Sequence, residues 1–130
     1  MDTLAVGRRL VELCKQGHNR KAIEELYAED AVSTEPMPGP TGDRVTRGKA
    51  ALLKGSDWFF ANHTIHSSFV DGPYPCDDAF ICMMGIDLTA KAGPMAGQRM
   101  EMKEAARYTV KNGKITSSTF YYPTDEMCKQ

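Results

Sequence analysis

The sequence lacks the features that mark nucleic-acid-binding, membrane-spanning and metal-binding chains. Its formal net charge is only −1, with acidic and basic residues interspersed, so we expect neither nucleic acid nor a membrane as a partner. No apolar run approaches the length of a membrane span, and the N-terminal residues, with an acid at Asp2, do not predict a signal peptide. The four cysteines are scattered, with no Cys-x-x-Cys pair. This argues against zinc and against a disulfide framework, and it suits the reducing cytoplasm.

What the chain does contain is the composition of one soluble globular domain. Hydrophobic residues make up 42% of the sequence and charged residues 25%, which is ordinary for such proteins. A chain of 130 residues can bury a core without disulfides or metals. No internal repeat, low-complexity tract or linker divides it, so we expect a single domain over residues 1–130.

The first half of the chain is predicted to be mainly helical. Apolar residues recur at helical spacing from Val6 to Cys14, and the run stops at Gly17. Asn19 is expected to cap a second helix that reaches Tyr27. A short strand over 31–35 and a proline- and glycine-rich loop over 36–42 follow. A third helix is expected over 49–62.

From residue 63 onward the hydrophobic period changes to two, which predicts strands over 64–70, 79–91, 100–110 and 114–122. The pair Asn112-Gly113 indicates a tight hairpin between the last two strands. Helices followed by a run of antiparallel strands define an α+β protein with helices on one face of a sheet. A strongly curved sheet covered by three helices would enclose a conical cavity.

One acid interrupts the apolar side of the predicted strand 100–110. Side chains alternate between the two faces of a strand, so Glu104 shares a face with Met102, Ala106 and Tyr108. A carboxylate on an apolar face is costly unless it is paired, hydrogen-bonded or protonated. Glu104 is therefore either a buried structural acid, bonded to a tyrosine hydroxyl or a backbone amide, or an acid that transfers protons in a cavity.

The order of these elements resembles the nuclear transport factor 2-like superfamily, which includes SnoaL-like polyketide cyclases, ketosteroid isomerases and scytalone dehydratase. Three segments carry the resemblance: residues 26–36 (Leu-Tyr-Ala-Glu-Asp-Ala-Val-Ser-Thr-Glu-Pro), residues 47–51 (Arg-Gly-Lys-Ala-Ala) and residues 112–115 (Asn-Gly-Lys-Ile). The resemblance implies a cone-shaped α+β fold, with a strongly curved antiparallel sheet packed on three N-terminal helices around a cavity. It is not specific for one activity, because one fold hosts many functions.

The similarity to ketosteroid isomerases implies roles for individual residues. Their proton-shuttling aspartate matches Glu35, and their hydrogen-bonding aspartate, four residues before an aromatic, matches Glu104 before Tyr108. Their tyrosine on the first helix falls near Leu10, which cannot donate a hydrogen bond. Glu35 would then be a general base; the alternative is an extended loop acid in solvent.

Further candidates are expected to line the cavity. Scytalone dehydratase-like enzymes use histidine there, so His66 is a candidate proton carrier, with a structural histidine as the alternative. Aromatic and methionine side chains are candidates for ligand contacts, although packing is the commoner fate of such residues. These candidates are Trp58, Tyr27, Tyr108, Tyr121 and Met102.

Two functions remain open at this point. The first is a cofactor-independent acid–base isomerase, cyclase or dehydratase acting on a small hydrophobic carbonyl compound, with no metal. The second is a non-catalytic small-molecule-binding or dimerisation module of the same fold. The resemblance also implies a homodimer formed through the open sheet face, where we expect Glu101, Lys103 and Arg107 together with Phe120 and Tyr122 from the neighbouring strand.

Overall fold

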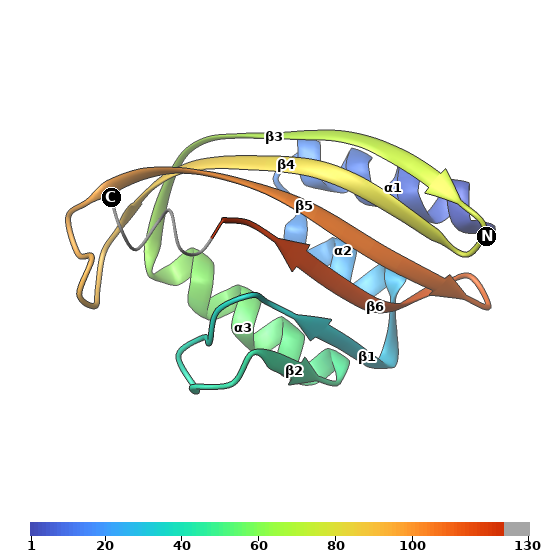
Figure 1. The fold of residues 1–130 in the computed structure, drawn as a ribbon, viewed down its shortest axis with the longest axis horizontal. Helices are drawn as coiled ribbons and strands as arrows, with labels where there is room; N and C mark the ends of the chain where they lie inside the picture. The colour runs from blue at the N-terminus through green and yellow to red at the C-terminus, as the bar shows by residue number, and fades with distance from the viewer. Residues whose placement is uncertain (124–130) are drawn as a thin grey trace.

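The computed structural model describes residues 1–123, which form three helices and one sheet (Figure 1). The elements in chain order are α1 (Thr3–Lys15), α2 (Asn19–Leu26), β1 (Tyr27–Thr34), β2 (Val45–Arg47), α3 (Lys49–Ala61), β3 (His63–Cys76), β4 (Ala79–Ala90), β5 (Arg99–Lys111) and β6 (Lys114–Tyr121). The α+β class expected from the sequence is confirmed.

Side-chain capping and glycine set the ends of α1. The Asp2 carboxylate accepts a hydrogen bond from the Ala5 N–H at 2.8 Å, which satisfies a free amide at the helix start. Gly17 adopts a φ of 76° just after the helix, a conformation that glycine reaches without strain. The predicted cap of α2 was wrong. His18 precedes the helix and Asn19 is its first residue, with its side-chain amide directed to the Cys14 sulfur.

The sheet has the strand order β2-β1-β6-β5-β4-β3. All neighbouring strands are antiparallel except β1 and β6, which run parallel. The expectation of a wholly antiparallel sheet is therefore corrected to a mixed sheet. The parallel pair arises because β1 enters the sheet from the helical hairpin and lies beside the last strand. Two further differences are the short strand β2, where no strand was expected, and β3, which continues through Gly72-Pro73 to Cys76 with a register shift.

The two faces of the sheet differ sharply. On the inner face, which we define as the side that packs on the helices, Phe80 and Cys82 of β4 lie beside Ala106 and Tyr108 of β5. These residues join buried side chains of α1 and α2 in one hydrophobic core. On the opposite, outer face the long strands β3, β4 and β5 arch over the molecule (Figure 1) without a covering helix.

A bulge between β5 and β6 decides which residues of β6 face inward. Val110 pairs with Ile115, but Thr109 pairs with Ser117, so one extra residue, Thr116, lies in β6. One extra residue moves every following side chain to the other face. Without the bulge Tyr121 would lie opposite Glu104, whereas the observed register places Tyr121 opposite Ala105.

No helix among residues 1–123 combines the length and the apolar character that a membrane crossing would need.

Candidate functional site

Glu104 lies on the inner face of β5, as strand alternation predicted. Its neighbours on that face, Ala106 and Tyr108, are 0% and 2% exposed, while Glu101, Lys103 and Arg107 are exposed on the outer face. Directly across the sheet, Met84 of β4 pairs with Glu104. The acid is therefore set among apolar and sulfur-containing side chains.

Burial changes the acidity of Glu104. Loss of hydration, and to a smaller extent the negative charge of Glu35, raise the pKa of its carboxyl group to about 7. Glu104 itself is half-buried, as are Met84 and Met102 beside it. This end of the inner face is thus partly accessible, unlike the sealed core around Tyr108.

Glu35 follows directly after β1 and continues the inward-facing positions Ala31 and Ser33, which are both buried. Its backbone is held from both sides by Arg44. The Glu35 N–H donates to the Arg44 carbonyl oxygen at 2.9 Å, and the Arg44 Nε donates to the Glu35 carbonyl oxygen at 3.0 Å. Burial raises the pKa of the Glu35 carboxyl, and a hydrogen bond from the Tyr122 hydroxyl opposes that rise.

The structure brings Glu35 and Glu104 to the same face of the sheet. Thr34 of β1 pairs with Thr119 of β6, which places Glu35 beside Phe120. Ala106 of β5 also pairs with Phe120. Glu35 and Glu104 are therefore separated by the width of one strand, close enough for the charge of Glu35 to act on Glu104.

Tyr122 belongs to this site, and sequence reasoning missed it. It was expected on the outer face with Phe120, because a regular hairpin would place both there. The bulge places both on the inner face instead: Phe120 packs edge-to-face on Tyr108, with ring centroids 6.3 Å apart. Tyr121 takes the outer position and is 53% exposed, which corrects its expected place in the cavity wall. No sequence signal in β6 marks the bulge.

The remaining tyrosine candidates lie in the core. Tyr108 stacks on Phe80 with ring centroids 4.9 Å apart, and its hydroxyl donates to the Met84 sulfur at 3.8 Å. Tyr27 is 7% exposed, and burial raises the pKa of both phenols. Tyr108 lies four residues from Glu104 on the same face and forms the deep end of the site, while Tyr27 belongs to the packing beneath it.

Met102 shares the inner face with Glu104 and lies opposite Ile86. Trp58 is 45% exposed on α3, where it contacts the His63 ring edge-to-face at 6.0 Å. His66 is exposed, and its Nε2 bonds the Thr89 hydroxyl at 2.7 Å. Thr89 is an outer-face position of β4, so the expectation that His66 shares the site with Glu104 is corrected.

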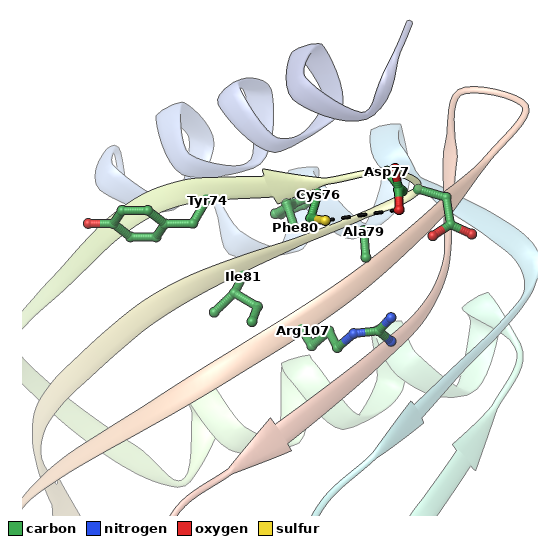
Figure 2. Close-up of a pocket in the computed structure, with 8 residues that line it drawn as sticks. Tyr74, Cys76, Asp77, Ala79, Phe80, Ile81 and Arg107 are labelled. Atoms are coloured by element: carbon green, nitrogen blue, oxygen red, sulfur yellow. Dashed lines mark hydrogen bonds between the residues drawn. The ribbon is translucent and has the colours of Figure 1, made fainter.

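Two surface hollows lie on the outer face, away from both acids. One, of about 300 Å³, is bordered by Tyr74, Cys76, Ile81 and Arg107 near the turn between β3 and β4 (Figure 2). The second, of about 310 Å³, surrounds Phe69, which covers Gly85. Among residues 1–123, no three His, Cys, Asp or Glu side chains are arranged to hold a metal ion.

The three helices and the six-stranded mixed sheet define an α+β protein of the cystatin-like fold class. The sequence profile of the SnoaL-like domain matches residues 1–122, and the chain therefore belongs to the SnoaL-like domain family. The resemblance inferred from the sequence is confirmed.

Solved structures agree with this assignment. A candidate SnoaL-like polyketide cyclase from Mesorhizobium loti is 43% identical, with 94% of this chain and 100% of that chain covered and a TM-score of 0.86. An NTF2-like protein of unknown function from Burkholderia pseudomallei is 15% identical, with coverage of 99% and 97% and a TM-score of 0.72. A protein with a ketosteroid isomerase-like fold from Catenulispora acidiphila is 17% identical, with coverage of 88% and 82% and a TM-score of 0.67. No protein of curated function matches this chain.

Proposed function

We propose that this chain is a cofactor-independent acid–base enzyme that acts on a small hydrophobic carbonyl compound as an isomerase, cyclase or dehydratase. One observation carries the proposal: Glu104 is a carboxyl group on an apolar face, with its pKa raised to about 7 by burial and by a second acid, Glu35. Two carboxyl groups with separated pKa values are suited to opposite roles in proton transfer. The candidate polyketide cyclase from Mesorhizobium loti supports the same class of chemistry.

The roles of the two acids follow from their surroundings. Glu104, in the more apolar environment, keeps its proton up to a pH near its pKa of about 7, and in that form it donates a hydrogen bond to the carbonyl oxygen of the substrate. Glu35, whose negative charge is stabilised by the Tyr122 hydroxyl, removes a proton from the adjacent carbon. The resulting enolate is stabilised by the Glu104 hydrogen bond, and Glu35 returns the proton at another position.

The surroundings of the acids favour an uncharged, apolar substrate. Met84, Met102 and Phe120 provide adaptable apolar contacts. A substrate carboxylate would meet two acids and is disfavoured. We therefore propose ligand contacts from these residues together with Tyr108. We propose that Trp58, which is exposed near the C-terminal end of α3, contacts a ligand only at that end of the helix.

Exchange of the substrate's α-proton for deuterium tests the proposal without knowledge of the natural substrate. A panel of cyclic ketones, enones and β-diketones in D₂O is followed by ¹H NMR with catalytic amounts of protein. We expect exchange above the buffer rate for at least one compound. Glu104→Gln and Glu35→Gln should each slow it by about 10²- to 10⁴-fold.

Glu101→Gln is the matched control, because Glu101 lies on the same strand but on the outer face. It should leave the rate unchanged. Exchange that persists in both the Glu35→Gln and the Glu104→Gln variants, or that falls equally in Glu101→Gln, would contradict the proposal.

The second candidate function, a non-catalytic binding or dimerisation module, is favoured by the outer face. Five large hydrophobic side chains on that face are 41–56% exposed: Phe69, Tyr74, Ile81, Met83 and Tyr121. A contiguous exposed apolar patch marks an association surface. We propose that this face pairs with a second copy of the chain, whether or not the inner face is catalytic.

We also propose a cytoplasmic location, because Cys14, Cys76 and Cys82 are free thiols.

A further inference from the structure

Tyr122 follows β6 at the point where the sheet brings the two acids together. Ala105 of β5 pairs with Tyr121, so the next residue along β6, Tyr122, lies beside Glu104. On the other side, the parallel pairing of Thr34 with Thr119 carries Glu35 alongside the same segment of β6. Tyr122 is half-buried and is placed between the two carboxyl groups.

The surroundings of the Tyr122 hydroxyl include the Glu35 carboxyl group and the backbone of Met37. Interaction with Tyr122 lowers the pKa of the Glu35 carboxyl and raises that of the phenol, and the Met37 backbone lowers the pKa of the phenol. Burial, together with the charges of Glu35 and Glu104, raises the pKa of the phenol to about 12. The hydroxyl is therefore a proton donor throughout the range in which the two acids titrate.

We propose that Tyr122 is a positioning residue that keeps the two acids in different roles: its hydroxyl holds Glu35 ionised and in place, and the charge held there keeps the proton on Glu104. This inference rests on the proposed function and adds a third member to the same site. The similarity to ketosteroid isomerases implied a tyrosine hydroxyl on the first helix, but this chain has the buried Leu10 near that position. Here the hydroxyl comes from the end of the last strand.

The other groups around the pair do not duplicate this role. Arg44 meets Glu35 at its backbone carbonyl oxygen. The inward-facing residues of β4 near the pair, Met84 and Ile86, are uncharged. On α3 the half-buried residues are uncharged except Lys49, whose ammonium group lies 3.7 Å from Glu29. The phenol of Tyr108 is buried and neutral.

Removal of the hydroxyl has a consequence with a definite sign. In Tyr122→Phe the Glu35 carboxylate loses a hydrogen bond to its charged form, so its pKa rises. Less negative charge then resides on Glu35 at a given pH, so the charge contribution that raises the pKa of Glu104 weakens and that pKa falls. The two titrations move toward each other. A residue that merely supports the strand end would move both in the same direction or neither.

Carboxyl ¹³C NMR measures these titrations directly. The protein is prepared with carboxyl-labelled glutamate, the signals are assigned with Glu35→Gln and Glu104→Gln, and each midpoint is followed against pH. In Tyr122→Phe we expect the Glu35 midpoint to rise by about one pH unit and the Glu104 midpoint to fall by a smaller amount. Tyr121→Phe is the matched control, because its side chain lies on the outer face, and it should leave both midpoints unchanged.

A second substitution reverses the effect. Incorporation of 3-fluorotyrosine at position 122 keeps the ring and makes the hydroxyl a stronger donor, so the Glu35 midpoint should fall. If Tyr122→Phe does not fold, the midpoints of the 3-fluorotyrosine protein test the proposal in its place. Unchanged midpoints in the folded variants, parallel movement of both, or the same effect from Tyr121→Phe would overturn the proposal.

These outcomes separate the role of Tyr122 from the proposed function. If the wild-type protein catalyses exchange, its rate rises with pH as Glu35 ionises and falls as Glu104 ionises, and Tyr122→Phe should narrow this profile from both sides. Converging midpoints without any turnover would support the positioning role and contradict the enzyme. Turnover with unchanged midpoints would support the enzyme and overturn the role of Tyr122.

Discussion

Glu35, directly after β1, and Glu104, in β5, share the inner face of the sheet with only β6 between the strands that lead to them. The two acids are far apart in the sequence and meet because β1 lies parallel to β6. Each carboxyl group loses hydration there, and the charge of Glu35 adds to the rise in the pKa of Glu104. Their proximity in an apolar setting is the physical basis of the proposed proton transfer.

The raised pKa of Glu104 predicts how stability depends on pH. In the folded protein this pKa is about 7, above the unfolded value of about 4.3. The folded state therefore favours the protonated acid, and stability is lost as the pH rises from about 4.3 through 7. Glu104→Gln should match the wild type at pH 4 and exceed its unfolding free energy by about 1 to 3 kcal/mol at pH 8.

Chemical denaturation at both pH values measures this difference. Glu101→Gln, on the outer face of the same strand, should show no comparable gain at pH 8. An equal effect of Glu104→Gln at pH 4 and pH 8 would show that Glu104 titrates normally in the folded protein.

Two glycines in helices predict opposite effects of the same substitution. A Cβ atom added to Gly7 in α1 would lie 2.8 Å from the Cβ of Pro73 and 3.2 Å from the Cγ of Phe80. This overpacking should destabilise Gly7→Ala by about 1 to 3 kcal/mol, despite the higher helix propensity of alanine. At Gly55 in α3 a Cβ meets nothing within 4 Å, so Gly55→Ala should stabilise by about 0.5 to 1 kcal/mol.

Thermal and urea unfolding of the two variants provide the comparison. Similar changes in the unfolding free energy of both variants would mean that helix propensity, and not the contact of α1 with β3, determines the effect of alanine at position 7.

The cysteines should differ strongly in reactivity. Burial raises the pKa of the Cys14 thiol to about 11 and that of Cys82 to about 12, so neither forms the reactive thiolate at neutral pH. Cys76 is exposed at the end of β3. Because Cys128 lies outside the described residues, the test uses Cys128→Ser as background: one thiol should react rapidly with Ellman's reagent, and none after the further change Cys76→Ser.

Rapid reaction of a second thiol in the native Cys128→Ser protein would show that the core around Cys14 and Cys82 opens readily.

The outer face predicts the state of association. Ile81 is 41% exposed between Tyr74 and Arg107. A second copy packed on this face would bury it, and Ile81→Lys would place a charge beside Arg107 in the interface. We expect a dimer in the wild type and a shift of at least tenfold toward monomer in Ile81→Lys, measured by analytical ultracentrifugation.

Met95→Lys is the control for this test. Met95 is also exposed, at 43%, but it lies in the loop between β4 and β5 and not on the sheet face. A monomeric wild type, or equal dissociation in both variants, would contradict pairing through the outer face.

Much of the fold was predictable because local patterns and tertiary packing agree. Helical spacing predicted α1 and α3, and alternation predicted β4 and β5 to within two residues at each end. Asn112 and Gly113 have φ angles of 52° and 76°, as the predicted tight hairpin requires. The strand β2 was missed because three residues carry too little periodicity to be recognised.

For the site, the sequence by itself determined the face of Glu104, because alternation along one strand is a local property. Tertiary structure alone decided its neighbours. The parallel pairing of β1 with β6 brings Glu35 to the same face, and the single extra residue Thr116 turns Tyr122 inward and Tyr121 outward. Alternation gives the relative faces of residues within one regular strand. Strand pairing and bulges depend on the energy of the whole sheet, so they decide which residues of different strands meet and where a strand changes face.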